Sequence, residues 1–402
     1  MSTKMTPQLR FPEFTDKWQV EKLGDIAEFS KGSSISKNDI HEDGKIEAIR
    51  YGELYTTYTE VINEVQSRTN LSPNGLKFSK ANDVIVPASG ETAIDIATAS
   101  CVLRDNIALS GDLNIIRTQN NGVFMAYYLN NKKKTDIARL AQGVSVIHLY
   151  SSNLKDLEVD LPSKPEQEKI ADFLTAVDER IAVGEKKLEL LETYKRGVMQ
   201  KIFSQKIRFK DENGNEYPEW EEKKLGDSIE KNKKRNKNLA VNYVQSVSNK
   251  HGFVSQDEYF DGANIASKNT SNYFVIEKGT FAYNPSRINV GSLAYKTDTE
   301  TSIVSPLYVS FKTKNDLENK FLLPWFSTLS FTKQMHRAFE GSVRDTLSYE
   351  ALSGMKIAVP CKEEQQKIAT FLATLDEKIT VEKSKLAAAR KFKKALLQRM
   401  FV

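Results

Sequence analysis

The amino-acid sequence predicts an α+β fold in which two similar globular domains are each followed by one long helix, with the two helices packed as an antiparallel coiled coil. The main observation is an internal repeat: residues 162–203 recur as residues 360–401 at a constant offset of 198, with 18 of 42 positions identical. A second repeat precedes it, because Trp18 and Trp220 are each followed five residues later by the triplet LeuGlyAsp. The doubled order of globule and helix predicts a pseudo-twofold internal repeat, with the globules at opposite ends of the helices.

Both copies of the repeated segment have the features of one long helix. Ser163 and Glu166 have the spacing of a capping box, and Pro165 lies in the first turn, where proline is tolerated. No proline follows within either copy. A helix of about 38 residues would extend roughly 57 Å, at about 1.5 Å per residue.

Apolar residues recur every three or four positions along both copies, as in the heptads of a coiled coil. The strongest seam positions are Ile170, Leu174, Val177, Ile181 and Leu188 in the first copy, and Ile368, Leu372, Leu375, Ile379 and Leu386 in the second. The seam is interrupted at matched places, by Gly184 and Glu382 and by Lys195 and Lys393. We expect these polar positions to fix the register between the helices. The alternative is that each segment is a solvated amphipathic helix.

Two carboxylate pairs recur in the helices, at residues 178–179 and 376–377. They follow from the duplication, and we expect them to form a solvated helix face rather than a catalytic site.

Composition limits the classes of protein that this chain can belong to. A length of 402 residues predicts two to three domains, and an apolar content of 40% is enough for hydrophobic cores. The net charge of +5 permits an anionic partner without requiring one. Two cysteines and four scattered histidines indicate neither a disulfide framework nor a metal site. The first ten residues lack the apolar core of a signal peptide, and no apolar run suits a membrane span, so we expect a cytoplasmic protein.

The repeat divides the chain into four parts: a first globule (1–161), a central helix (162–205), a second globule (206–359) and a C-terminal helix (360–402). We expect residues 1–14 to be a loosely held arm. Each globule begins with short strands separated by turns and ends with helical segments. In the first globule the predicted strands are 46–54, 83–89, 97–103 and 113–118, and the predicted helices are 123–131 and 135–143.

This layout resembles the specificity subunit of a type I restriction–modification enzyme. The resemblance covers nearly the whole chain and rests on the doubled helix with EQEKIADFL (166–174) and EQQKIATFL (364–372), the LeuGlyAsp triplets, and YNPSRINVGSL from Tyr283. It implies that each globule is a target-recognition domain for one half of a bipartite, asymmetric DNA sequence, and that the helices set the spacing. One departure is SKGSSIS from Ser30, which has few glycines where the family would have a glycine-rich turn.

The resemblance also implies partners: double-stranded DNA, two methyltransferase (modification) subunits docked on the helices, and restriction/translocase subunits in the full complex. Adenine methylation and ATP-dependent cleavage would belong to those partners, which would hold S-adenosylmethionine, ATP and Mg. This chain would then be a non-catalytic component of a phage-defence system. The sequence agrees by omission, since it contains no GxGxxG, GxxxxGK[ST] or HExxH motif.

DNA recognition needs side chains that present donors and acceptors to base edges, together with Lys and Arg for phosphates. In the first globule we predict Lys31, Ser33, Ser34, Lys37, Arg50, Tyr51 and Ser89. In the second we predict Lys250, His251, Asn284, Ser286, Arg287 and Asn289. The alternative for each of these residues is an ordinary solvated polar group. The basic run KNKKRNKN (231–238) suits phosphate contact or a solvated loop equally well.

Two other functions are compatible with part of this pattern. A coiled-coil adaptor that does not bind DNA would explain the helices, but not two globules with a common frame and different surfaces. An enzyme with an unrecognised nuclease site would need a clustered set of Asp, Glu and Lys, and none stands out.

Overall fold

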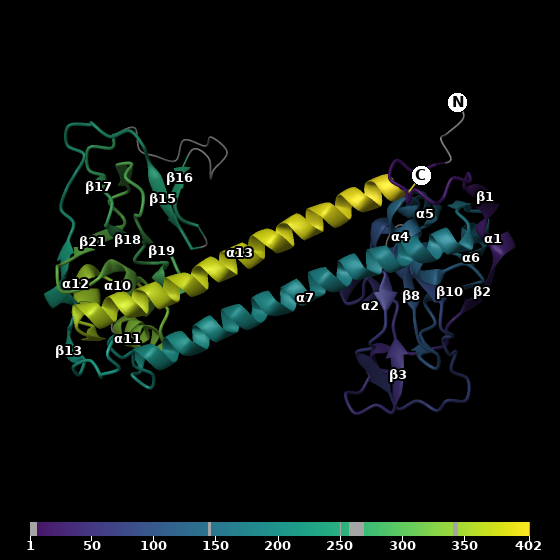
Figure 1. The fold of residues 1–402 in the computed structure, drawn as a ribbon, viewed down its shortest axis with the longest axis horizontal. Coiled ribbons are helices and arrows are strands. Elements are labelled where there is room, and N and C mark those ends of the chain that lie inside the picture. Colours follow the sequence, from purple (N-terminus) through teal and green to yellow (C-terminus); the bar gives the residue numbers. More distant parts are fainter. Residues whose placement is uncertain (1–5, 144–145, 250, 257–268, 341–344, 402) are drawn as a thin grey trace. The chain divides into compact units, whose positions relative to one another are not determined.

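The computed structural model describes residues 6–143, 146–249, 251–256, 269–340 and 345–401. The chain forms two compact units, of which unit 1 comprises residues 1–186 and 383–402 and unit 2 comprises residues 187–382. Both units share two long helices, α7 (Lys164–Phe203) and α13 (Lys362–Met400), each of which contributes one half to each unit. The two predicted helices are therefore confirmed (Figure 1).

The globule of unit 1 is built on a five-stranded sheet. Its order is β2 (Ala27–Lys31), β10 (Leu113–Thr118), β6 (Asp83–Pro87), β8 (Ser100–Val102) and β4 (Val61–Ile62). A three-stranded sheet of β5 (Ser67–Thr69), β3 (Ile46–Ile49) and β9 (Ala108–Leu109) lies at the end of the globule away from the helices (Figure 1). Two further pairs are β1 (Gln19–Lys22) with β12 (Glu158–Leu161), and β7 (Ser89–Gly90) with β11 (Ile147–His148). The helical segments are α1 (Leu23–Ile26), η1 (Lys37–Asp39), α2 (Glu53–Thr56), α3 (Ala93–Ile96), α4 (Gly122–Asn131), α5 (Lys134–Leu140) and α6 (Ser151–Lys155).

The globule of unit 2 repeats the part of this frame that lies next to the helices. Its sheet has the order β14 (Ile229–Lys231), β21 (Val309–Thr313), β18 (Phe281–Tyr283) and β19 (Leu293–Tyr295). The other pairs are β13 (Glu221–Lys224) with β22 (Lys356–Val359), β15 (Gln245–Ser248) with β16 (Gly252–Ser255), and β17 (Phe274–Ile276) with β20 (Ser302–Val304). The helical segments are α8 (Leu225–Ser228), η2 (Ile288–Val290), α10 (Asn319–Trp325), α11 (Leu329–Glu340) and α12 (Tyr349–Ser353).

Comparison of the two globules separates a common frame from a variable lobe. Both begin with a strand that pairs with the strand entering the long helix, β1 with β12 and β13 with β22. The two globules differ most in the three-stranded sheet of unit 1 and in the strand pairs β15–β16 and β17–β20 of unit 2. The predicted strand over residues 46–54 is wrong in its second half. Glu53 begins a helical turn there, because its buried carboxylate accepts hydrogen bonds from the Arg50 backbone at 2.9 Å and from the Arg50 guanidinium at 3.2 Å.

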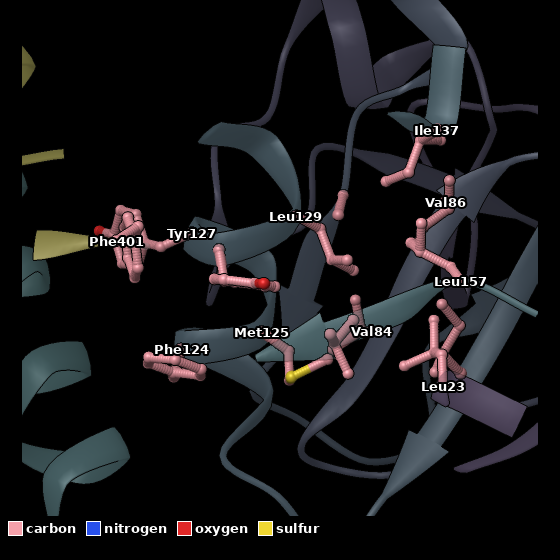
Figure 2. Packing of buried hydrophobic residues seen from close by; sticks show 14 of the residues in the cluster. Leu23, Val84, Val86, Phe124, Met125, Tyr127, Leu129, Ile137, Leu157 and Phe401 are labelled. Carbon is pink, nitrogen blue, oxygen red and sulfur yellow. The ribbon is translucent and has the colours of Figure 1, made fainter. Parts of the chain in front are cut away.

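The core of each unit lies between the sheet, the following helices and the long helices. In unit 1, Phe401 at the end of α13 packs edge-on to Phe124 of α4, with ring centroids 5.8 Å apart. Figure 2 shows Phe124, Met125, Tyr127 and Leu129 of α4 beside Val84 and Val86 of β6. The end of the C-terminal helix is therefore part of the first globule's core. Burial of these side chains supplies the main stabilising term, about 1.5–3 kcal/mol for each large apolar residue.

Within each unit the two helix halves run in opposite directions, as the ion pairs between them show. Lys393 and Arg390 of α13 pair with Asp178 and Glu185 of α7 in unit 1, at 2.8 and 2.5 Å. Lys195 of α7 pairs with Asp376 of α13 in unit 2, and Lys187 pairs with Glu382 at 2.8 Å. The charged seam positions Lys195, Lys393 and Glu382 thus each meet an opposite charge on the other helix. The expectation that all four repeated carboxylates are solvated is wrong for Asp178, which is half-buried against Lys393; Asp376 is exposed, although it pairs with Lys195.

The predicted loose arm is wrong for residues 6–14. The Arg10 guanidinium donates two hydrogen bonds of 2.7 Å to the fully buried carboxylate of Glu166, and the Phe11 and Phe173 ring centroids lie 5.7 Å apart. Glu166 also accepts a 3.4 Å bond from Trp18 Nε1, so its carboxylate serves this cluster and not the predicted capping box. A buried carboxylate needs a counter-charge, and the arm supplies it.

The same cluster occurs in unit 2, with its Arg, Glu and Phe residues offset by 198 and its tryptophan by 202. Arg208 bonds to Glu364 at 2.9 and 3.3 Å, Trp220 Nε1 bonds to Glu364 at 3.0 Å, and the Phe209 and Phe371 centroids lie 5.5 Å apart. The backbone agrees as well, since the Leu9 N–H donates to the Arg399 carbonyl at 2.8 Å and the Ile207 N–H donates to the Lys201 carbonyl at 3.2 Å. The arm thus occupies, against the end of α13, the place that the chain after α7 occupies in unit 2.

Candidate nucleic-acid interface

The first predicted binding loop follows β2 and lies against the start of β10. Gly32 approaches the backbone closely, since a Cβ at this position would stand 2.0 Å from the Ser110 carbonyl oxygen. The Ser33 hydroxyl donates to the Leu109 carbonyl at 3.3 Å and accepts from the Lys77 N–H at 3.0 Å. Ser33 is therefore a structural anchor, whereas Lys31 and Ser34 are exposed beside it. A single glycine at the point of closest approach suffices here, despite the few glycines in this segment.

An open hollow of about 630 Å³ lies in front of this loop. It is lined by Gly32, Ser33, Ser34, Leu71, Ser72, Asn74, Gly75, Leu76 and Lys77. The loop over residues 71–77 was not predicted as part of a binding surface, because nothing in its composition distinguishes it from an ordinary turn.

The other predicted residues of unit 1 differ in their freedom to bind. Arg50 is held by Glu53, and the Tyr51 N–H donates to Ser110 Oγ at 3.1 Å. Lys37 is exposed on η1. Ser89 is buried in β7, where it pairs with His148, so its side chain does not lie on the surface. The structure thus leaves Lys31, Ser34 and Lys37 as the exposed members of the set.

In unit 2 the predicted residues Asn284–Asn289 form a tight turn after β18. Asn284 Oδ1 accepts from the Ser286 N–H at 3.0 Å, and the Leu347 N–H donates to the Pro285 carbonyl at 3.0 Å. Gly291, with φ of +87°, then turns the chain into β19 through a conformation that favours glycine. Ser286, Arg287 and Asn289 are exposed on this turn.

The turn faces the β15–β16 hairpin across a recess of about 190 Å³. This recess brings together Asn284 and Arg287 with residues that the sequence did not single out: Ser246, Ser248, Asn249, Val254, Ser292 and Tyr308, with Val247 and Val290. The predicted His251 is exposed at the tip of this hairpin, and its N–H donates to Ser248 Oγ at 3.3 Å. Lys250 lies outside the described residues. The sequence gives no sign that Tyr308 and Asn249 line this recess, because residues 249 and 308 are brought near Asn284 only by the packing of the strands.

The basic run over residues 231–238 is largely engaged within unit 2. Lys231 pairs with Glu350 at 3.0 Å, and the Arg235 guanidinium lies 3.7 Å from the centroid of the Phe274 ring. Lys234 and Lys312 both bond to Glu277 and hold the pKa of that carboxyl below its usual value. Lys233 and Lys237 are exposed and are the residues of this run best placed for a phosphate.

Lys296 is a buried cation that the sequence did not predict. Its ammonium donates to Gln245 Oε1 at 2.8 Å and pairs with Asp298 at 2.9 Å. Desolvation opposes ionisation of Asp298, but the bond from Lys296 outweighs it and lowers the pKa of this carboxyl. Lys296 thereby fixes β15 against the end of β19 and supports the hairpin side of the recess.

The predicted seam residues pack inside the chain. Ile170, Leu174, Ile181, Ile368, Leu372, Leu375, Ile379 and Leu386 are buried, and Val177 and Leu188 are partly buried. Any partner docked on the helices would therefore contact other faces. Matched, exposed apolar side chains are available there, at Val183 and Val381 and at Tyr194 and Phe392.

The arrangement of the described residues also bears on two other kinds of feature, metal sites and membrane spans. Among the described residues, no group of three or more His, Cys, Asp or Glu side chains is arranged to hold a metal ion. In the same part of the chain, no helix combines the length and apolar character needed to cross a membrane.

Comparison with known proteins places this architecture in a family. The family model described as the Type I restriction modification DNA specificity domain matches twice, over residues 15–193 and 217–390. The type I restriction enzyme MjaVIII specificity subunit of Methanocaldococcus jannaschii is 23% identical over 412 residues, covering 97% of this chain and 92% of the relative. The crystal structure of a type I restriction-modification system S subunit from M. genitalium superposes with a TM-score of 0.63 at 18% identity and covers 99% of both chains. A chain from a structure on complex assembly and conformational transition of the type I R-M system gives a TM-score of 0.53 at 15% identity, covering 97% of this chain and 98% of that chain. This chain therefore belongs to the type I restriction-modification specificity subunit family and carries two copies of its specificity domain.

Proposed function

We propose that this chain is the DNA-recognition subunit of a type I restriction–modification complex, and that each globule recognises one half of a bipartite, asymmetric target. One observation carries the proposal: each match to the specificity domain covers a globule of common frame, and the two globules differ most in the lobes that hold their exposed loops. A common frame with different lobes is what two similar readers of different half-sites require.

In unit 2, Arg287 and Asn284 would contact base edges from the rim of the recess. An arginine presents two parallel donors to guanine O6 and N7, and an asparagine amide presents a donor and an acceptor to adenine. The exposed lysines Lys31 and Lys37 in unit 1, and Lys233 and Lys237 in unit 2, would contact phosphates and add affinity without sequence preference.

The long helices would set the distance between the half-sites and dock two modification subunits. The matched apolar side chains Tyr194 and Phe392 suit such contacts, because each is more than half exposed, at 56% and 53%. Tyr194→Asp and Phe392→Asp should each weaken the association of modification subunits and leave the circular dichroism spectrum unchanged. The matched control is Thr193→Asp, which introduces the same charge at a neighbouring exposed position.

Chemistry would belong to the partner subunits, with S-adenosylmethionine for adenine methylation and ATP with Mg for translocation and cleavage. This chain would supply target choice and geometry without catalysis, in the cytoplasm and on the DNA. The name shared by its relatives, specificity subunit, supports this division of labour.

The test is a genome-wide adenine-methylation map of the host, with and without the gene. We expect a split, asymmetric motif that disappears on deletion and returns on complementation. The purified chain, assembled with its modification subunits, should also bind a duplex carrying that motif more tightly than a scrambled duplex. Equal binding to both duplexes, together with an unchanged methylation map, would refute the proposed function.

A further inference from the structure

Unit 1 contains a groove of about 630 Å³ beside the last turns of α13. Lys132, from the turn after α4, and Lys134, at the start of α5, line one side, and Arg390 and Lys394 of α13 line the other. Its apolar surface comes from Leu397 of α13, from Phe401 directly after this helix, and from Ile94 of α3, which is half exposed. Phe401 is anchored from below by Phe124, as Figure 2 shows.

The cations of this groove are not all neutralised within the chain. Arg390 pairs with Glu185, and Lys393 pairs with Asp178 and Glu60. Lys132, Lys134 and Lys394 form no ion pair with any of the described residues. The groove therefore has three free positive charges around an apolar floor.

The internal repeat shows that this charge does not follow from the architecture. Residues 383–402 contain seven Lys and Arg and no Asp or Glu, whereas the matched residues 185–204 contain five basic and three acidic residues. The net charge is thus +7 in one copy and +2 in the other, although both copies pack against a globule in the same way. The excess of positive charge is therefore specific to residues 383–402, the copy that lines the groove.

The matched region of unit 2 is closed by side-chain contacts. Gln200 Nε2 donates to the Ser327 carbonyl at 3.2 Å, and Gln200 Oε1 accepts from the Leu329 N–H at 3.0 Å. Phe203, which matches Phe401, packs on Phe321 with ring centroids 5.1 Å apart. In unit 1 the matched Gln398 is exposed and lines the groove. The end of the groove beside Gln398 is thus open in unit 1, whereas Gln200 closes the matched end in unit 2.

We propose that the unit 1 groove docks an acidic segment of the modification subunit, a segment with at least one apolar side chain between its carboxylates. This inference rests on the proposed function, and it makes the two units unequal as docking sites. The three free lysines would pair with carboxylates, while Ile94, Leu397 and Phe401 would contact the apolar side chain. Electrostatic complementarity of this kind fixes partner choice and orientation.

Two observations favour a protein partner over DNA. Phosphate contact needs exposed cations but does not need an apolar surface. This groove has an apolar floor as well as cations, which suits a protein segment. The groove lies beside α4, α5 and α13. The three-stranded sheet that contains β3 lies at the other end of the unit 1 globule (Figure 1), and the loops predicted to bind DNA adjoin this sheet.

The experiment compares two charge-reversal triples of the full chain. Lys132→Glu/Lys134→Glu/Lys394→Glu changes the groove, and Lys278→Glu/Lys320→Glu/Lys333→Glu makes the same change in charge at exposed positions of unit 2 that lie off the long helices. The binding of the purified modification subunit encoded with this chain is measured without DNA, followed by the binding of the assembled complex to DNA. We expect the groove triple to weaken one subunit-binding step by about tenfold or more. The control triple should not.

A gentler variant protects the test against misfolding. Lys132→Gln/Lys134→Gln/Lys394→Gln removes charge without adding any, and Ile94→Glu alters the floor at an exposed position; both should weaken the same step. Unchanged subunit binding by both variants would overturn the proposal. Normal subunit binding with weakened DNA binding would also overturn it and identify the groove as a phosphate contact. Because subunit binding is measured without DNA, failure of this inference is distinct from failure of DNA recognition.

Discussion

The Lys393 ammonium of α13 lies 2.8 Å from the Asp178 carboxylate of α7, and the repeat places Lys195 against Asp376 in the same way. Burial alone would lower the pKa of Lys393, but Glu60 and Asp178 outweigh that effect and raise it. A lysine in an otherwise apolar seam is thus held charged by one carboxylate from the other helix and one from the globule. Lys393 therefore links the register of the two helices, through Asp178, to the position of the globule, through Glu60.

We predict that Lys393→Met destabilises unit 1 by about 2 kcal/mol, because it leaves Asp178 partly buried without its counter-ion. Hydrogen exchange of unit 1 amides is the appropriate measurement, since a protein of two units need not unfold in one step. Lys391→Met, at an exposed position two residues away, is the control and should change little. Equal protection in both variants would contradict a stabilising role for the pair.

The same pair predicts a pH dependence. Since the pKa of Lys393 is raised on folding, its contribution to stability is complete below the unfolded value of about 10.4 and is lost as pH rises through the folded value. Wild-type unit 1 should therefore lose stability above about pH 10.4 more steeply than Lys393→Met. Denaturant unfolding from pH 8 to pH 11, with both proteins side by side, would show this difference. Parallel curves would mean that the lysine contributes equally in both states.

The arm and its charge cluster give a third prediction. Arg10→Ala leaves the buried Glu166 without its counter-charge, and we expect a loss of about 3 kcal/mol in unit 1. Arg10→Ala/Glu166→Gln should recover part of that loss, because the remaining group is then neutral. Arg208→Ala is the matched variant and should act on unit 2, where Arg208 pairs with Glu364. Local hydrogen exchange distinguishes the two units, and a loss spread evenly over both would contradict separate clusters.

Arg287→Ala should relax one base position in one half-site only. Each bidentate contact to a base contributes about 1–3 kcal/mol of discrimination, so we expect roughly 5- to 150-fold less preference at that position. The readout is the methylated motif of the reassembled complex. Arg337→Ala, exposed on α11 of the same unit, is the control for lost charge. Weaker binding to all sequences alike would assign Arg287 to the phosphates.

The helices should act as the spacer between half-sites. Insertion of seven residues into both α7 and α13 preserves the heptad seam and lengthens each helix by about 10.5 Å. At about 3.4 Å per base pair, the gap in the recognised motif should grow by roughly three base pairs. Insertion into α7 alone should disrupt the seam and abolish assembly. A motif with an unchanged gap in the double insertion would refute the spacer role.

The sequence alone determined the repeat, the two helices and their seam, because each of these depends on periodicity and on identity at a fixed offset. The family came from the resemblance of the repeated motifs to a known family. Helix periodicity is a local property of the sequence. The repeat of apolar residues such as Leu174 and Leu372 therefore identifies the buried face of each helix, even when the element packed against it is not known. Even the polar interruptions at Lys195 and Lys393 could be recognised, because they occur twice.

Only the tertiary structure decided which charges these lysines meet and that residues 6–14 dock on α7. It also showed that Ser33 and Ser89 are engaged in the fold, whereas Arg287 faces a recess with Tyr308. These relationships join residues that are far apart in sequence, and no local pattern encodes them. Pairing of β18 with β21 brings Asn284 beside Tyr308, and the Val247 N–H of β15 donates to the Tyr308 hydroxyl at 3.3 Å, so Asn249 lines the same recess. The physical reason is that burial and charge pairing are satisfied by the folded chain as a whole, so a polar residue's role depends on neighbours that the sequence does not name.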